Sequence, residues 1–163
     1  MIETVFGCQK DQYFMHEALM YAHCAQKEGE VPIGAVLVDE QGVIIATAYN
    51  KTEALHSQQA HAEMRVMAEA GQKRKDWRLQ DCWLYVTLEP CLMCTGCILL
   101  SRLKGVVYAA PSPLFGSFSY LDKMALSSVY KMNMPIVLSG VCEDEAVILL
   151  KSFFKEKREQ CRD

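Results

Sequence analysis

Residues 84–97, LYVTLEPCLMCTGC, decide the fold because they join a buried strand directly to a short helix. The apolar run at residues 84–88 predicts the strand, and Pro90 suits the helix entry because the first turn does not need its missing N–H. Cys91 and Cys94 then lie one helical turn apart, so their sulfur atoms share one face beside the positive end of the helix dipole. This position favours the thiolate, the form of cysteine that binds metals or acts as a nucleophile.

A second short stretch, AHAEM at residues 60–64, supplies further polar side chains. His61 is a third candidate metal ligand, and three nitrogen or sulfur ligands with an open position are the composition of a catalytic zinc site. Glu63 is two residues further on, so on a regular helix it points to a different face from His61. The spacing therefore favours one ligand and one nearby proton-transfer group over two ligands.

Each of these residues also has a simpler interpretation. A C-x-x-C pair that follows a strand is how thioredoxin-like redox proteins present their cysteines. A single histidine is usually a hydrogen-bonded structural residue, and a single glutamate is usually a surface carboxylate. Redox chemistry does not require H-x-E, so His61 and Glu63 together favour the metal interpretation. Cys97 extends the cysteine spacing: as a fourth ligand it would close the site, but a small buried core residue is the favoured interpretation.

Length and composition are those of an ordinary globular chain. The 163 residues suffice for one domain, residues 1–163, and 51% hydrophobic with 23% charged residues excludes a disordered chain. No apolar run approaches the ~20 residues needed to cross a bilayer. The N-terminal sequence MIETVFGCQK has no secretory-signal pattern. Eight cysteines without a leader indicate a reducing compartment, so we expect the protein in the cytoplasm and not in a membrane.

The formal net charge of −3 by itself argues against a nucleic-acid partner, but the distribution of charge matters more than its sum. Two basic clusters stand out, one before residue 80 and one near the C-terminus. Their members are Lys73, Arg74, Lys75 and Arg78 in the first, and Lys151, Lys155, Lys157, Arg158 and Arg162 in the second. Two solvated helix faces are the simpler interpretation, and contact with RNA is the alternative.

The hydrophobic pattern predicts one mixed α/β sheet with helices on both faces. Strands are expected at residues 33–38, 43–49, 82–88, 106–110 and 135–138, and helices at 11–27, 60–70, 91–103, 121–128 and 143–160. We expect Asp11 to cap the first helix, and Gly29 and Gly71 to end the first two. Strand, helix and strand over residues 82–110 imply a right-handed parallel crossover.

The combination of H-x-E and P-C-x-x-C is the signature of zinc-dependent nucleobase deaminases. The chain resembles the cytidine/deoxycytidylate deaminase superfamily and, within it, the bacterial tRNA-specific adenosine deaminases. The similarity includes EVPIGAVLV at residues 30–38, QAHAEM at 59–64, SRLKGVVYAA at 101–110 and the closing helix. It implies a cytidine deaminase-like three-layer α/β/α fold with a five-stranded sheet. It also implies hydrolytic deamination of adenosine to inosine at the wobble position of a tRNA anticodon stem-loop, with the arginine tRNA bearing the ACG anticodon as the expected substrate.

The resemblance also assigns roles to single residues. It implies one Zn²⁺ per subunit on His61, Cys91 and Cys94, with Glu63 as the proton shuttle. For substrate binding it implies a base-edge contact from Asn50, pocket groups from the Ala62 N–H and the Glu89 carbonyl, and an RNA contact from His56. A solvent-exposed loop histidine is the alternative interpretation of His56. The resemblance further implies a homodimer.

One loop departs from the family pattern. After the fourth strand the family usually has a glycine-rich loop of the D-x-K-x-G-A-x-G-S kind, whereas residues 111–118 here read PSPLFGSF. This loop borders the nucleic-acid groove in the family, so the substrate is the open question. The alternatives are a deaminase of a free nucleobase or nucleoside (guanine or cytosine), a thiol redox protein, and a zinc-stabilised binding module without enzymatic activity.

Overall fold

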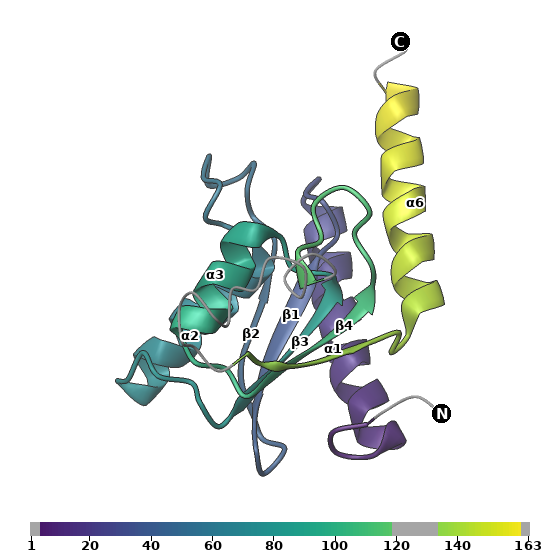
Figure 1. Cartoon of the computed structure of the whole chain (residues 1–163). Coiled ribbons are helices and arrows are strands. Elements are labelled where there is room, and N and C mark those ends of the chain that lie inside the picture. Colours follow the sequence, from purple (N-terminus) through teal and green to yellow (C-terminus); the bar gives the residue numbers. More distant parts are fainter. Residues whose placement is uncertain (1–3, 119–133, 161–163) are drawn as a thin grey trace.

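The computed structural model describes residues 4–118 and 134–160, in which five strands form a mixed sheet (Figure 1). The strands are β1 (Gly34–Asp39), β2 (Ile44–Tyr49), β3 (Cys82–Leu88), β4 (Gly105–Ala110) and β5 (Ile136–Ser139). They lie in the order β2-β1-β3-β4-β5. β1 is antiparallel to β2 and to β3, whereas β3, β4 and β5 are mutually parallel neighbours. The expected mixed five-stranded sheet and the parallel crossover from residue 82 to 110 are confirmed.

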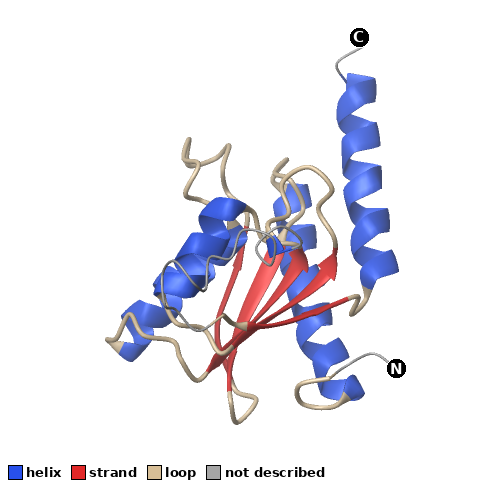
Figure 2. Ribbon diagram, in the orientation of Figure 1, coloured by secondary structure: helices blue, strands red, loops and turns tan. Residues whose placement is uncertain are grey.

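Helices cover both faces of this sheet (Figure 2). Those in the described residues are α1 (Cys8–Lys27), α2 (Ala62–Arg74), α3 (Leu92–Leu100) and α6 (Glu143–Gln160). Two apolar clusters divide in the same way: one contains Ala18 of α1 and Leu149 of α6, and the other contains Val66 of α2 and Ile98 of α3. We call these the α1–α6 side and the α2–α3 side. The three-layer arrangement is as expected.

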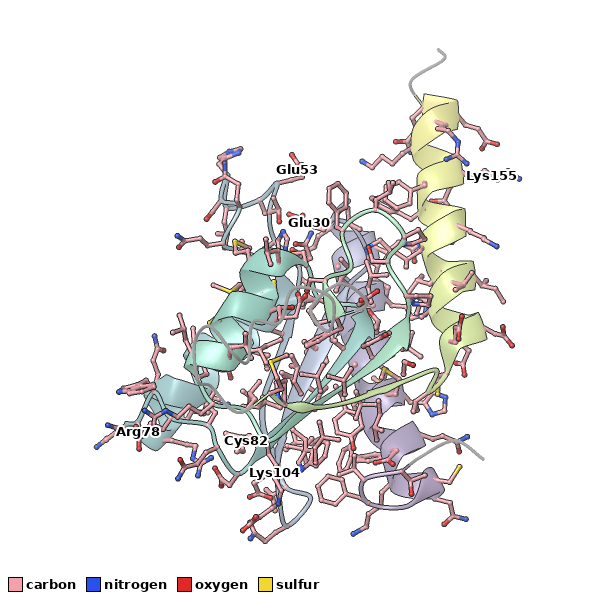
Figure 3. The ribbon with its side chains drawn as sticks, in the orientation of Figure 1. Glu30, Glu53, Arg78, Cys82, Lys104 and Lys155 are labelled. Carbon is pink, nitrogen blue, oxygen red and sulfur yellow. The ribbon has the colours of Figure 1, made fainter. Side chains whose placement is uncertain are left out.

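The strand directions decide where a site can form. β2, β3 and β4 run the same way because β1 is antiparallel to both β2 and β3. Their carboxyl ends therefore lie at one edge of the sheet, followed by Asn50, by Glu89 and by residues 111–118. Figure 3 shows Glu30 at this edge and Lys104 at the opposite one. Ligands of open α/β sheets bind outside the carboxyl ends of the strands.

The first helix begins earlier than the sequence predicts, and Asp11 is not its N-cap. α1 starts at Cys8 after Gly7, whose φ of 93° favours glycine. Asp11 is buried in the first turn, where its carboxylate accepts hydrogen bonds from the N–H groups of Val5 and Phe6 and from the hydroxyl of Tyr85. In the sequence this aspartate resembles an N-cap. In the structure its carboxylate instead accepts hydrogen bonds from the segment before the helix and from a residue of β3.

The other helix boundaries also differ from the predicted ones. α2 continues past Gly71 to Arg74, because good helix formers follow the glycine and Lys75 ends the helix in a left-handed conformation with φ of 55°. α3 ends at Leu100 rather than Leu103, since Arg102 adopts a φ of 60°. The predicted helix at residues 121–128 lies outside the described residues. No helix in the described part of the chain is long and apolar enough to span a bilayer.

Candidate active site

A cavity of about 630 Å³ opens at the carboxyl-end edge of the sheet. Its lining combines His61, Glu63 and Cys91 with polar residues near the end of β2, while Leu114 and Phe154 belong to an apolar rim. This volume lies within the range of small-molecule sites, and such sites combine apolar walls with a few placed polar groups. The cavity is therefore the candidate active site.

The N-termini of α2 and α3 converge on this cavity and bring together three predicted ligands. His61 and Cys91 directly precede the two helices in extended conformations, and Cys94 lies in the first turn of α3. Nδ1 of His61 lies 3.7 Å from Sγ of Cys91 and 3.4 Å from Sγ of Cys94, and the two sulfur atoms are 3.7 Å apart. We call this group the His61 cluster.

The His61 cluster has the dimensions of a zinc site. With Zn–S bonds of about 2.3 Å and Zn–N bonds of about 2.0 Å, tetrahedral angles place two sulfur atoms about 3.8 Å apart and a sulfur and a nitrogen about 3.5 Å apart. The three observed separations agree with these values to within about 0.2 Å. Imidazole nitrogen and cysteine sulfur are also the donors that zinc prefers, so the residues fit this metal.

Hydrogen bonds inside the cluster favour a thiolate. The contacts of Cys91 with the Cys94 thiol and with His61 lower its pKa to about 4, although burial opposes this. The contact with Cys91, together with burial, raises the pKa of Cys94. The pKa of His61 is raised by its hydrogen bond to Cys91. One negatively charged sulfur is therefore available to a cation at neutral pH.

Glu63 is a buried carboxylate without a complete set of partners. Its side chain lies in the first turn of α2 and is 4% exposed, and Oε2 forms no hydrogen bond within the described part of the chain. Burial raises the pKa of this carboxyl group. An unpaired buried polar atom is rare in native structures. Glu63 lines the cavity, and its carboxylate does not belong to the group of three ligand atoms. It is therefore placed to exchange protons with a molecule in the cavity.

Asn50 lines the same cavity, in a network that the sequence reasoning did not include. Its Nδ2 donates to Oε2 of Glu30 over 3.1 Å, and its Oδ1 accepts from the hydroxyl of Thr52 over 2.8 Å. Glu30 is buried and also accepts from the backbone N–H groups of Glu53 and Ala54. Both ends of the Asn50 amide are thus oriented. The available signal was a glutamate directly before the mostly apolar stretch at residues 31–38.

The other predicted substrate-binding residues differ in position. Glu89 is buried in the cavity wall, and its Oε2 accepts from the N–H of Ser112 over 3.0 Å. Ala62 is fully buried at the start of α2 and does not itself line the cavity. His56 is exposed on the loop after β2, with a φ of 47°, and lies outside the cavity lining.

The unusual loop at residues 111–118 forms the rim of the cavity. Gly116 pairs with Cys91 in an isolated β-bridge, and a Cβ at this glycine would overlap the Glu89 carboxylate and lie 2.6 Å from the Ser112 carbonyl oxygen. Leu114 and Phe115 are 84% and 73% exposed at the cavity mouth. The loop is therefore fixed at its glycine and apolar at its tip, whereas the sequence showed only that it departs from the family pattern.

The two basic clusters differ in their partners. In the first, three cations pair with nearby acids, as Lys73–Glu69, Arg74–Asp81 and Arg78–Asp76. On α6, Lys151, Lys155 and Arg158 form no ion pair with any described acid. They line a groove that shares Leu150 and Phe154 with the cavity, and Figure 3 shows Lys155 directed away from the sheet. The solvated-face interpretation suits the first cluster, whereas the second is open to anions.

Cys97 does not extend the ligand set. Its side chain is half-buried and packs against the apolar core of the α2–α3 side, and its sulfur lies 3.9 Å from the hydroxyl of Ser101. Within residues 4–118 and 134–160, the ligand atoms that lie close to one another at this site are those of His61, Cys91 and Cys94. A site closed by a fourth cysteine ligand is therefore not what the structure contains.

The sequence profile of the cytidine and deoxycytidylate deaminase zinc-binding region matches residues 8–110, which include every member of the His61 cluster. The chain belongs to this deaminase family. It is therefore an enzyme that catalyses deamination, a hydrolase acting on C–N bonds. Membership decides against the redox protein and the non-enzymatic binding module.

Relatives within the deaminase family narrow the comparison. The tRNA-specific adenosine deaminase of Bacillus subtilis is 43% identical over 93% of this chain and 92% of its own length. That of Buchnera aphidicola is 38% identical over 91% and 97%. A solved structure from a study of A-to-I editing by tRNA:A34 deaminases superposes with a TM-score of 0.76 and 38% identity, covering 85% of this chain and 99% of that one.

Guanine deaminases also share the fold. The structure of guanine deaminase from Bacillus subtilis is 32% identical, with a TM-score of 0.58 over 73% of each chain. A guanine deaminase from Nitrosomonas europaea superposes with a TM-score of 0.71 at 21% identity, over 87% of this chain and 83% of that one, which indicates the common fold alone.

Proposed function

We propose that this deaminase converts adenosine to inosine at the wobble position of a tRNA anticodon stem-loop, with the arginine tRNA bearing ACG as substrate. The observation that carries the proposal is the buried Glu63 carboxylate, one oxygen of which has no hydrogen bond within the described residues, beside the His61 cluster in a cavity of a size that accepts a purine. We assign one zinc ion per subunit to this cluster. The seven cysteines of the described residues are free, which supports a cytoplasmic, reducing location.

The residues of the cavity have different roles in the reaction. The chemistry that a bound zinc ion supplies is a water nucleophile activated at neutral pH. Glu63 takes the proton that this water gives up, delivers it to the adenine ring nitrogen beside the reacting carbon, and helps to protonate the departing amine. Adenosine and water become inosine and ammonia. Asn50, held by Glu30, contacts the edge of the base, and the Glu89 carbonyl contributes to the pocket wall.

The rim of the cavity favours a polynucleotide over a free base. Phe115 of the loop and Phe154 of α6 are exposed aromatic side chains in the cavity lining, and unpaired bases stack on such side chains. The unpaired cations of α6 offer contacts for phosphates. His56, exposed on the loop after β2, is assigned a further RNA contact. Relatives that are named tRNA-specific adenosine deaminases support the same substrate class.

We assign a homodimer to this enzyme, with α3 in the interface. Leu92, Met93 and Leu100 of this short helix are exposed, although such apolar side chains are usually covered. Analytical ultracentrifugation tests the assignment: Leu92→Glu with Leu100→Glu shifts a dimer to a monomer, whereas a dimer that survives both changes uses another surface.

The deciding experiment measures inosine in an anticodon stem-loop that carries ACG, with zinc content determined on the same preparation. We expect inosine at the first anticodon position, none in a stem-loop carrying GCG, and one zinc per chain fewer in Cys91→Ala than in the wild type. If Cys91→Ala lowers the zinc content but the wild type forms no inosine, the metal assignment holds and the tRNA substrate is wrong.

Free guanine or cytosine is the second candidate substrate, favoured by the 32% identity to the Bacillus subtilis guanine deaminase structure and by the departure of residues 111–118. The same preparation is incubated with each free base and with adenosine, and ammonia release is followed. Turnover of a free base without inosine in the stem-loop would establish this alternative.

A further inference from the structure

A second group of metal-ligand side chains lies on the α1–α6 side of the sheet. It combines His16 of α1 with Cys142, which directly precedes α6, and Glu145 in the first turn of α6. Nε2 of His16 lies 3.2 Å from Oε1 of Glu145 and 3.6 Å from Sγ of Cys142. The three ligand atoms lie within 4.8 Å of one another, and among the described residues only the His61 cluster offers another such group. We call this second group the His16 cluster.

The separations in the His16 cluster also fit a single zinc ion. Zn–S bonds of about 2.3 Å and Zn–N or Zn–O bonds of about 2.0 Å place sulfur and nitrogen about 3.5 Å apart, and nitrogen and oxygen about 3.3 Å apart. The observed values are 3.6 Å and 3.2 Å. A hydrogen-bonded His16–Glu145 pair would account for the shorter contact alone, but it would not need a cysteine beside it. Cysteine, histidine and glutamate together are donors that zinc accepts.

The backbone at Cys142 adopts an uncommon conformation. Its φ of 57° lies in the left-handed region, which residues other than glycine, asparagine and aspartate rarely adopt. Such conformations cost free energy and are concentrated at functional sites. The turn between β5 and α6 already has Gly140, with a φ of 88°, as a residue suited to this region. This conformation occurs directly before α6, where the sulfur of Cys142 lies beside Nε2 of His16.

We propose that His16, Cys142 and Glu145 form a second zinc site, which joins α1 to the start of α6. Water completes the coordination, because the side chains of His16 and Glu145 are 53% and 59% exposed. Zinc displaces the thiol proton of Cys142 when it binds.

The position of the second site gives it a consequence for the cavity. α6 contributes Leu150 and Phe154 to the cavity lining, two and three turns beyond the proposed metal. A zinc ion that holds the start of α6 against α1 therefore fixes the direction in which the helix carries these side chains to the cavity. The site is structural, and neither its assignment nor its test depends on the proposed substrate.

The test counts zinc in the full chain. Metal-free protein is dialysed against excess Zn²⁺, and bound zinc is measured by mass spectrometry, with circular dichroism as the check on folding. We expect the wild type to bind two zinc ions per chain. His16→Ala and Cys142→Ser each bind one fewer, and Cys91→Ala loses the other. His16→Ala serves as the second variant because position 142 has an unusual backbone and its substitution can disturb the turn.

Matched controls lie on the same helix. His23 and Cys24 of α1 are exposed and belong to neither cluster, so His23→Ala and Cys24→Ser keep two zinc ions. Cobalt(II) gives a second readout, since a thiolate–cobalt absorption band remains in the Cys91→Ala, Cys94→Ala double variant and disappears when Cys142→Ser is added. Equal zinc content in the wild type and a folded His16→Ala protein overturns the proposal, whatever the total.

Discussion

The two His–Cys clusters lie on opposite sides of one sheet and are built differently. On the α2–α3 side, His61 and Cys91 precede two converging helices at the base of a cavity, and buried Glu63 stands beside them with an unpaired oxygen. On the α1–α6 side, His16 and Glu145 are exposed, and the carboxylate belongs to the ligand group itself. The two clusters thus have similar donor atoms, but among the described residues only the His61 cluster has a separate proton-transfer group and a cavity beside it.

As proposed, the His61 cluster is a reactive metal site and the His16 cluster a structural one, and the difference lies in their surroundings. The ligands determine which ion binds. Turnover also needs a cavity for the substrate and an acid–base group that can reach it. Only the His61 cluster, within the described residues, has both. Substitutions in and around the two clusters test this difference, beginning with the largest effect.

The largest effect is expected from Glu63→Gln. The amide keeps the shape of the side chain but cannot shuttle a proton, so deamination of the stem-loop falls by about 10²–10⁴-fold while the zinc content stays unchanged. Glu69→Gln is the matched control on the same helix, where the side chain pairs with Lys73 at the surface. Loss of zinc together with activity would mean that Glu63 is a ligand, which would remove the main distinction between the clusters.

Gly116→Ala tests how closely the loop at residues 111–118 packs against the His61 cluster. Its Cβ would overlap the Glu89 carboxylate, so the bridge to Cys91 has to shift, and a displacement of about 1 Å lowers kcat by about 10²-fold. Gly71→Ala is the control, because its Cβ finds only ordinary contacts and an alanine in a helix adds about 0.5–1 kcal/mol of stability. Full activity in Gly116→Ala would show that the loop position does not matter.

Phe115→Ala tests the rim that the second cluster lacks. Stacking on an aromatic side chain contributes about 1–3 kcal/mol per base, so KM for the stem-loop rises by about 5- to 150-fold while kcat changes little. Phe115→Tyr restores the KM, and Tyr13→Ala, an exposed aromatic on α1, leaves it unchanged. A fall in kcat at constant KM would instead assign the loop to the positioning of catalytic groups.

Zinc-dependent stability gives the smallest effect and tests the second cluster directly. At a zinc concentration ten times its Kd, the second site adds about 1.4 kcal/mol, which raises Tm by about 3–6 °C. Thermal unfolding with and without Zn²⁺ should therefore show a smaller zinc-dependent rise in the His16→Ala, Cys142→Ser double variant than in Cys24→Ser. Equal rises in the two proteins would reduce the His16 cluster to an ordinary ion pair.

The local pattern was enough to predict one of the two clusters. Cys91 and Cys94 are three residues apart after a strand, and H-x-E combined with P-C-x-x-C seldom occurs in one chain by chance. His16 and Cys142 are 126 residues apart, so no spacing rule connects them. Short-range backbone geometry fixes the relative positions of Cys91 and Cys94 alone. His61 is 30 residues before Cys91, and it was joined to them through the known combination of the two motifs.

The same limit explains the errors in the elements. Asp11 has the sequence of an N-cap, but its carboxylate accepts from Val5, Phe6 and Tyr85 once the sheet has formed. Gly71 is typical of a helix end in the sequence. The helix nevertheless continues through this glycine and ends before Lys75. In both cases a tertiary contact or a local sum of propensities outweighed a single-residue signal.

The sequence by itself predicted the mixed sheet, the three candidate ligands of the His61 cluster and the place of Glu63 outside that set. Hydrophobic periodicity and the spacing inside each motif act over a few residues, and the known combination of the two motifs linked His61 to the cysteines 30 and 33 residues further on. Only the tertiary structure decided that Glu30 orients Asn50, that Phe115 and Phe154 share a rim, and that a second cluster forms on the other side. These contacts join segments that are remote in sequence, so they exist only where the packed sheet and helices bring the segments together.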